Sequence, residues 1–138
     1  MTAHQKHAKG AAAPKILVIE DDRLFSDIYA AKFAEEGFQV LLSSDGEDGL
    51  RKLAAEKPDV VLLDIILPKV TGLEMLERVR AHADPAVRDV PVIVVTNLNQ
   101  ETYVEKMRAF GVKAYFVKAN VLFSQVLKEI HAILGARR

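Results

Sequence analysis

The stretch VVLLD at residues 60–64 is a run of four apolar residues that ends in an acid. The stretch ILVIEDD at residues 16–22 has the same form, with four apolar residues followed by three acids. A continuous Val, Ile and Leu run without polar alternation is typical of a strand buried on both faces, as in a parallel sheet. These stretches therefore predict two core strands, each with carboxylates at its carboxyl end.

Apolar runs alternate with amphipathic segments along most of the chain. The runs cover residues 16–19, 38–42, 60–63, 92–95 and 114–117, and the amphipathic segments cover residues 24–35, 46–56, 72–80, 101–110 and 122–134. This alternation indicates a parallel sheet with helices on its faces. Right-handed crossovers then predict an α/β fold, a three-layer (βα)5 doubly wound sheet of the flavodoxin-like strand order 2-1-3-4-5. A site in such a sheet is expected at the carboxyl ends of the strands, near the point where the strand order reverses.

Length and composition limit the classes of function. The chain has 138 residues, with 19 basic and 19 acidic side chains and no cysteine. This predicts one domain, no general attraction to nucleic acid or membrane surfaces, and neither disulfides nor thiolate metal sites. No apolar run approaches the length of a membrane span. We expect a cytoplasmic protein with a disordered N-terminal tail at residues 1–14, which lacks the apolar centre of a signal peptide, and a folded domain at residues 15–138.

Candidate site residues follow four of the five predicted strands. In chain order they are Glu20, Asp21, Asp22, Asp64, Thr96 and Lys118. Since the carboxyl ends of parallel strands share one edge of the sheet, we expect these side chains to converge. Closely spaced carboxylates repel one another and favour a hard cation, and Mg²⁺ suits a site with a few carboxylates, a carbonyl and several waters. With a hydroxyl and an ammonium beside them, the carboxylates predict a phosphoryl-transfer site with a carboxylate nucleophile.

Each of these residues has a simpler interpretation when it is taken alone. A single acid after a strand is more often a helix cap, and a single lysine there is usually a solvated surface charge. For Asp22 we favour the cap of the following helix, and Glu20 could be only a charge-balancing neighbour. The prediction of a phosphoryl site therefore depends on the joint occurrence of these residues at the correct strand ends.

Four segments resemble the signature segments of response-regulator receiver domains of two-component signal transduction, of the stand-alone, single-domain type. They are ILVIEDD (16–22), VVLLDIILPKVTGLE (60–74), PVIVVTN (91–97) and AYFVKAN (114–120). The resemblance implies that Asp64 is the phosphorylated residue and that Lys118 and Thr96 contact the phosphoryl group. It also implies that Thr96 acts as a switch together with the aromatic Tyr115.

The same resemblance implies a metal site and a role in signalling. The Mg²⁺ ligands would be Glu20, Asp21, Asp64 and the backbone carbonyl of Ile66. Asp64 would accept its phosphoryl group from a phosphohistidine of a sensor histidine kinase or a histidine phosphotransfer protein. The phosphorylated domain would then switch its binding of a downstream protein target, through the surface of residues 101–110, 114–117 and 122–134.

The resemblance further implies that the protein is no enzyme beyond its own phosphorylation and dephosphorylation. It implies no direct contact with nucleic acid or membrane, and a monomer or weak dimer. The alternative is a pseudo-receiver, a protein-binding module that is not phosphorylated. A metal-dependent phosphohydrolase is disfavoured because Ile66, two residues after Asp64, cannot serve as an acid or base. A flavin-binding flavodoxin is disfavoured because no Ser/Thr/Gly-rich phosphate loop follows the first strand.

Two positions depart from the usual pattern of that family. Ala119 follows Lys118 where the family typically has proline, often with a cis bond. We predict a trans bond here, because a cis bond without proline costs roughly 2.5 to 4 kcal/mol. Asn97 follows Thr96 where a small Ala or Gly is commoner, so we expect narrower access to the phosphoryl group.

Overall fold

A computed structural model describes residues 13–98 and 100–136 of the chain. The strands are β1 (Lys15–Ile19), β2 (Gln39–Ser43), β3 (Val60–Leu63), β4 (Val92–Thr96) and β5 (Ala114–Val117). The helices are α1 (Arg23–Glu35), α2 (Gly46–Glu56), α3 (Gly72–Arg80), α4 (Pro85–Arg88), α5 (Glu101–Ala109) and α6 (Phe123–Ala136). Within this described part, no helix is long and apolar enough to cross a membrane. The predicted tail at residues 1–14 lies outside the described residues, apart from Ala13 and Pro14.

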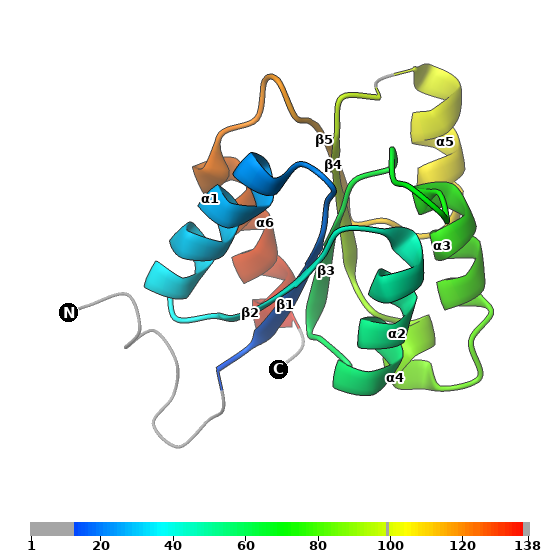
Figure 1. The fold of residues 1–138 in the computed structure, drawn as a ribbon, viewed down its shortest axis with the longest axis horizontal. Helices are drawn as coiled ribbons and strands as arrows, with labels where there is room; N and C mark the ends of the chain where they lie inside the picture. The colour runs from blue at the N-terminus through cyan, green and yellow to red at the C-terminus, as the bar shows by residue number, and fades with distance from the viewer. Residues whose placement is uncertain (1–12, 99, 137–138) are drawn as a thin grey trace.

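The strands form one parallel sheet in the order β2-β1-β3-β4-β5. Helices α1 and α6 cover one face of this sheet, and α2, α3 and α5 cover the other (Figure 1). The predicted α/β class, its three layers and its strand order are thereby confirmed. The strand order reverses at β1, so β1 and β3 lie side by side although α1, β2 and α2 separate them in the chain.

Strand β1 shows how the sheet separates two apolar cores. Successive side chains of a strand point to opposite faces. Leu17 and Ile19 accordingly belong to the core beneath α2, α3 and α5, whereas Ile16 and Val18 belong to the core beneath α1 and α6. All four side chains are at most 1% exposed. Burial of one such side chain contributes about 1.5 to 3 kcal/mol, so packing strongly stabilises β1, which carries the acids that follow it.

The register of the strands brings their carboxyl ends together. Ile19 of β1 pairs with Leu63 of β3, so the next residues, Glu20 and Asp64, begin side by side. A hydrogen bond of 3.0 Å from the Asp64 N–H to the Ile19 carbonyl continues this pairing. Thr96 of β4 pairs with Val117 of β5, and a hydrogen bond of 2.8 Å from the Lys118 N–H to the Thr96 carbonyl places Lys118 beside Thr96.

Helix α4 is a single short turn that hydrophobic periodicity does not predict, because four residues are too few to show a helical repeat. Its start does carry two local signals. The Asp84 side chain accepts a hydrogen bond from the Ala86 N–H, and Pro85 occupies the first turn, where a proline is tolerated. The Arg80 guanidinium then joins the end of α3 to this region, with hydrogen bonds to the carbonyls of Arg88, Val90 and Phe110.

Candidate functional site

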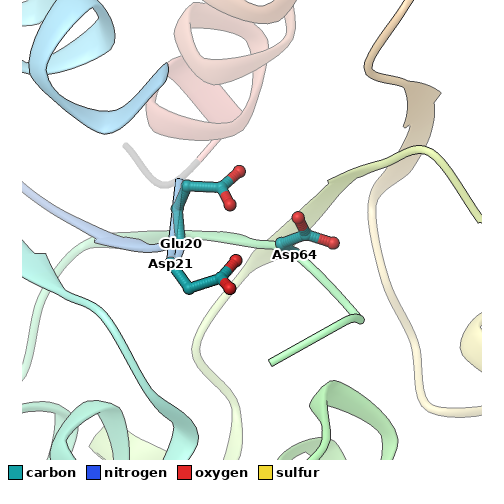
Figure 2. A group of neighbouring side chains, drawn as sticks. All are labelled: Glu20, Asp21 and Asp64. Atoms are coloured by element: carbon teal, nitrogen blue, oxygen red, sulfur yellow. The ribbon is translucent and has the colours of Figure 1, made fainter. Parts of the chain in front are cut away.

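Three carboxylates form a cluster at the carboxyl ends of β1 and β3. Glu20 and Asp21 follow β1 and Asp64 follows β3, and one oxygen of each carboxylate lies within 4.8 Å of those of the other two. Figure 2 shows the Glu20 and Asp21 side chains extending toward the side on which Asp64 lies. Glu20 and Asp64 are buried, whereas Asp21 is exposed. Two members of the cluster are therefore shielded from solvent, and the side formed by Asp21 is open to it.

Lys118 contacts two of these carboxylates from the end of β5. Its Nζ atom lies 2.8 Å from Asp64 Oδ2 and 2.5 Å from Glu20 Oε1. It also lies 4.8 Å from the centre of the Phe25 ring on α1, within the range of a cation–π contact. Burial alone would lower the pKa of Lys118, but its contacts with the Asp64 and Glu20 carboxylates outweigh that effect and raise the pKa. The side chain is thus held as an ammonium.

Asp64 is held by donors on both of its oxygens. Thr96, which is fully buried, donates its hydroxyl to Asp64 Oδ1 at 2.6 Å. The Ile66 N–H donates to the same oxygen at 3.1 Å, and Lys118 binds the other oxygen. Gly72 allows the loop after Asp64 to fold back tightly, because a Cβ atom there would lie 2.9 Å from the Asp64 carbonyl oxygen. These contacts hold the carboxylate in one orientation beside Glu20 and Asp21.

Glu20 shows that the cluster favours a further cation. Burial raises the pKa of Glu20 to about 7, even though the contact with Lys118 and the hydrogen bond from the Asp22 N–H favour its ionised form. Its Oε1 atom forms the ion pair with Lys118 but accepts no hydrogen bond within the described part of the chain. When all are ionised, three carboxylates facing one ammonium leave two negative charges uncompensated. This charge and the all-oxygen donor set fit one Mg²⁺ ion.

Two of the residues singled out in the sequence lie beside this cluster. Asp22 is the N-cap of α1, as predicted, because its Oδ1 atom accepts from the Leu24 and Phe25 N–H groups at 3.1 and 3.3 Å. Tyr115 donates its hydroxyl to the Leu98 carbonyl, in the loop that follows Thr96. Burial, with a smaller contribution from the charge of Asp64, raises the pKa of Tyr115.

Two contacts of the site were not predicted. Phe25 lies in the first turn of α1 against the Lys118 ammonium, and its only sequence signal is its closeness to the acidic strand end. Asn97 accepts a hydrogen bond of 3.0 Å from the Ala119 N–H. The sequence signal for this second contact is that residue 119 is alanine and not proline, so that it has a backbone N–H to donate. The bond between Lys118 and Ala119 is trans, since the described chain contains no cis peptide, and this prediction is confirmed.

Residues 16–130 match the family model described as the response regulator receiver domain. The chain therefore belongs to the receiver domains of two-component response regulators, which are signalling modules rather than classical enzymes.

Individual relatives differ in how much of their length the chain spans. It is 33% identical over 121 residues to Protein PilH of Pseudomonas aeruginosa, covering 88% of this chain and 98% of PilH. It is 34% identical over 82 residues to the response regulator MprA of Mycolicibacterium vanbaalenii, covering 59% of this chain and 34% of MprA. Among solved structures, a CheY-like receiver domain protein of Methanospirillum hungatei superposes with a TM-score of 0.82 at 26% identity, covering 90% of this chain and 95% of that one.

Proposed function

We propose that Asp64 accepts a phosphoryl group from a phosphohistidine in a Mg²⁺-dependent reaction, and that this event changes the binding of a downstream protein. The observation that carries the proposal is the setting of Asp64. One carboxylate is contacted by an ammonium and a hydroxyl on its two oxygens and lies beside two further acids. A pseudo-receiver is not favoured, because nothing in that set is missing. Residues 15–138 would form the receiver domain.

The residues of the site have distinct roles in this reaction. Glu20, Asp21, Asp64 and the Ile66 carbonyl would hold Mg²⁺, which supplies charge neutralisation for the phosphoryl oxygens. One Asp64 oxygen attacks the phosphorus while the P–N bond of the phosphohistidine breaks and its electron pair returns to the imidazole. The Lys118 ammonium and the Thr96 hydroxyl then bind oxygens of the transferred group. Phosphoryl transfer needs mainly such alignment and charge stabilisation.

Thr96 and Tyr115 offer a route from the phosphoryl group to the surface. The Thr96 hydroxyl accepts a hydrogen bond from the Leu98 N–H at 3.3 Å, and the Tyr115 hydroxyl binds the carbonyl of the same residue. Movement of Thr96 toward a phosphoryl group would therefore shift Leu98 and so alter the hydrogen bond that Tyr115 makes to the Leu98 carbonyl. We propose that the face formed by α5, β5 and α6 is read by the downstream protein. The donor would be a sensor histidine kinase or a histidine phosphotransfer protein, and neither nucleic acid nor membrane would be bound directly.

Incubation with acetyl phosphate and Mg²⁺ is expected to add one phosphoryl group to the protein, because the chemistry at Asp64 needs no kinase surface. Intact-mass spectrometry would detect the addition. The adduct should persist in acid, disappear in base as an acyl phosphate does, and be absent when EDTA replaces Mg²⁺. An unmodified mass after incubation with Mg²⁺ would favour the pseudo-receiver instead.

A further inference from the structure

A side chain bridges the two loops that leave β4 and β5. Asn97 Oδ1 accepts the Ala119 N–H at 3.0 Å. Asn97 directly follows Thr96, and Ala119 directly follows Lys118. Both residues are exposed, so the bridge lies at the solvent edge of the site. It thereby joins the segments that carry the two donors to Asp64.

The bridge extends the pairing of the two strands beyond the sheet. The last paired residues are Thr96 and Val117, and the Lys118 N–H still donates to the Thr96 carbonyl at 2.8 Å. The next N–H along the chain is that of Ala119, and the amide side chain of Asn97 accepts it. A proline at position 119 has no N–H to donate. The bridge therefore requires both the amide at position 97 and a residue other than proline at position 119.

The geometry at Asp64 gives this bridge a consequence for the reaction. Thr96 donates to Oδ1 at 2.6 Å and Lys118 to Oδ2 at 2.8 Å, so the two donors hold the carboxylate between the ends of β4 and β5. Their separation is set by how far those two strand ends stand apart. A contact that ties the next residues together limits any spreading of these ends.

We propose that Asn97 is a positioning residue, which through Ala119 keeps the Thr96 hydroxyl and the Lys118 ammonium at the spacing that the incoming phosphoryl group requires. The inference builds on the proposed function and concerns the alignment step of that reaction. Among the hydrogen bonds of the described residues, that of Asn97 goes to Ala119 and to none of Glu20, Asp21 and Asp64. Its removal should therefore slow phosphoryl transfer without weakening the metal site.

The size of the effect follows from the nature of the contact. One intramolecular hydrogen bond contributes a net stabilisation that corresponds to roughly a two- to tenfold change in an equilibrium. If the bridge only aligns the donors, its loss should lower the rate of phosphorylation by about that factor. The affinity for Mg²⁺ should not change, because both bridging residues lie outside the acidic cluster.

The test compares Asn97→Ala with Asn120→Ala, the same substitution at a second exposed asparagine nearby. Three quantities are measured on the full chain: the rate of phosphorylation by saturating acetyl phosphate, the Mg²⁺ affinity, and hydrogen exchange of the Ala119 amide. We expect Asn97→Ala to react about two- to tenfold more slowly, to exchange the Ala119 amide faster, and to bind Mg²⁺ as the wild type does. Asn120→Ala should match the wild type in all three.

A second variant separates the bridge from other effects of Asn97. Ala119→Pro removes the donor, and the double variant Asn97→Ala/Ala119→Pro should react no more slowly than Ala119→Pro alone, since one hydrogen bond can be lost only once. The inference would be overturned if the rate reductions of the two single variants multiplied in the double variant, or if Asn97→Ala reacted at the wild-type rate. So would an Ala119 amide that exchanges equally fast in the wild type and Asn97→Ala. Exchange needs no phosphorylation, so this result stays separate from a failure of the proposed function.

Discussion

Lys118→Met is expected to lower the rate of phosphorylation by acetyl phosphate about 100-fold, the loss typical for removal of one preorganised donor from a developing charge. The Lys118 ammonium is the cation that lies 2.8 Å from the Asp64 carboxylate. Methionine keeps an apolar stem of similar length beside Phe25, so the change removes charge with little change in packing. The rate would be followed by intact mass at saturating phosphodonor and Mg²⁺.

Two comparisons make this result specific. Lys128→Met on α6 replaces an exposed lysine and should react at the wild-type rate. Lys118→Met should bind Mg²⁺ more tightly than the wild type, because it removes a positive charge from beside Glu20 and Asp64. A slow variant with weakened Mg²⁺ binding would instead indicate a damaged site. A variant that reacts as fast as the wild type would show that Lys118 does not contribute to phosphorylation.

Asp21→Ala should weaken Mg²⁺ binding by at least tenfold. Loss of a residue that only supports a metal ligand already lowers metal affinity by about 10- to 100-fold, and Asp21 is a proposed ligand itself. Asp21 is the exposed member of the acidic cluster and borders its open side. Asp22→Ala is the matched control, since it removes the neighbouring carboxylate, which caps α1. It should cost about 1 kcal/mol of stability and leave the Mg²⁺ affinity nearly unchanged. Equal losses in a calorimetric titration of the two variants would mean that the wrong acid had been assigned to the metal.

The pH of that titration matters because of Glu20. Its folded-state pKa of about 7 lies above the ordinary value of 4.5, so the metal-free folded protein binds this proton more tightly than the unfolded chain does. The contribution of Glu20 therefore favours folding below about pH 4.5 and is lost as the pH rises through 7. Mg²⁺ competes with the same proton, so its affinity should fall between pH 8 and pH 6, and this fall should be smaller in Glu20→Gln.

Local sequence signals predicted some boundaries of the fold better than others. The predicted ends of β3, α2 and α3 agree with the structure, because a continuous apolar run or a capping residue marks each of them. Strand β2 lies one residue later than predicted, at Gln39–Ser43. It is an edge strand, and mostly half-buried, so its ends are set by pairing with β1, beginning with Lys15 beside Gln39. That pairing cannot be read from hydrophobicity alone.

The site divides in the same way between what sequence patterns predict and what they do not. The convergence of Asp64, Thr96 and Lys118 follows from the topology, because strand ends of a parallel sheet must meet at one edge. The bridge between Asn97 and Ala119 depends on the path of two loops and on one side-chain rotamer. No residue pattern specifies those, although the absence of proline at position 119 made the contact possible.

The most direct measurement on Asp64 is to trap the phosphorylated protein by reduction of its acyl phosphate and to locate the changed residue by peptide mass mapping. Wild type and Asp64→Asn would be treated in parallel with acetyl phosphate and Mg²⁺. We expect the change at Asp64 alone in the wild type and no change anywhere in Asp64→Asn. Modification of another acid in the wild type, or equal labelling of Asp64→Asn, would contradict the assignment of Asp64 as the phosphoryl acceptor.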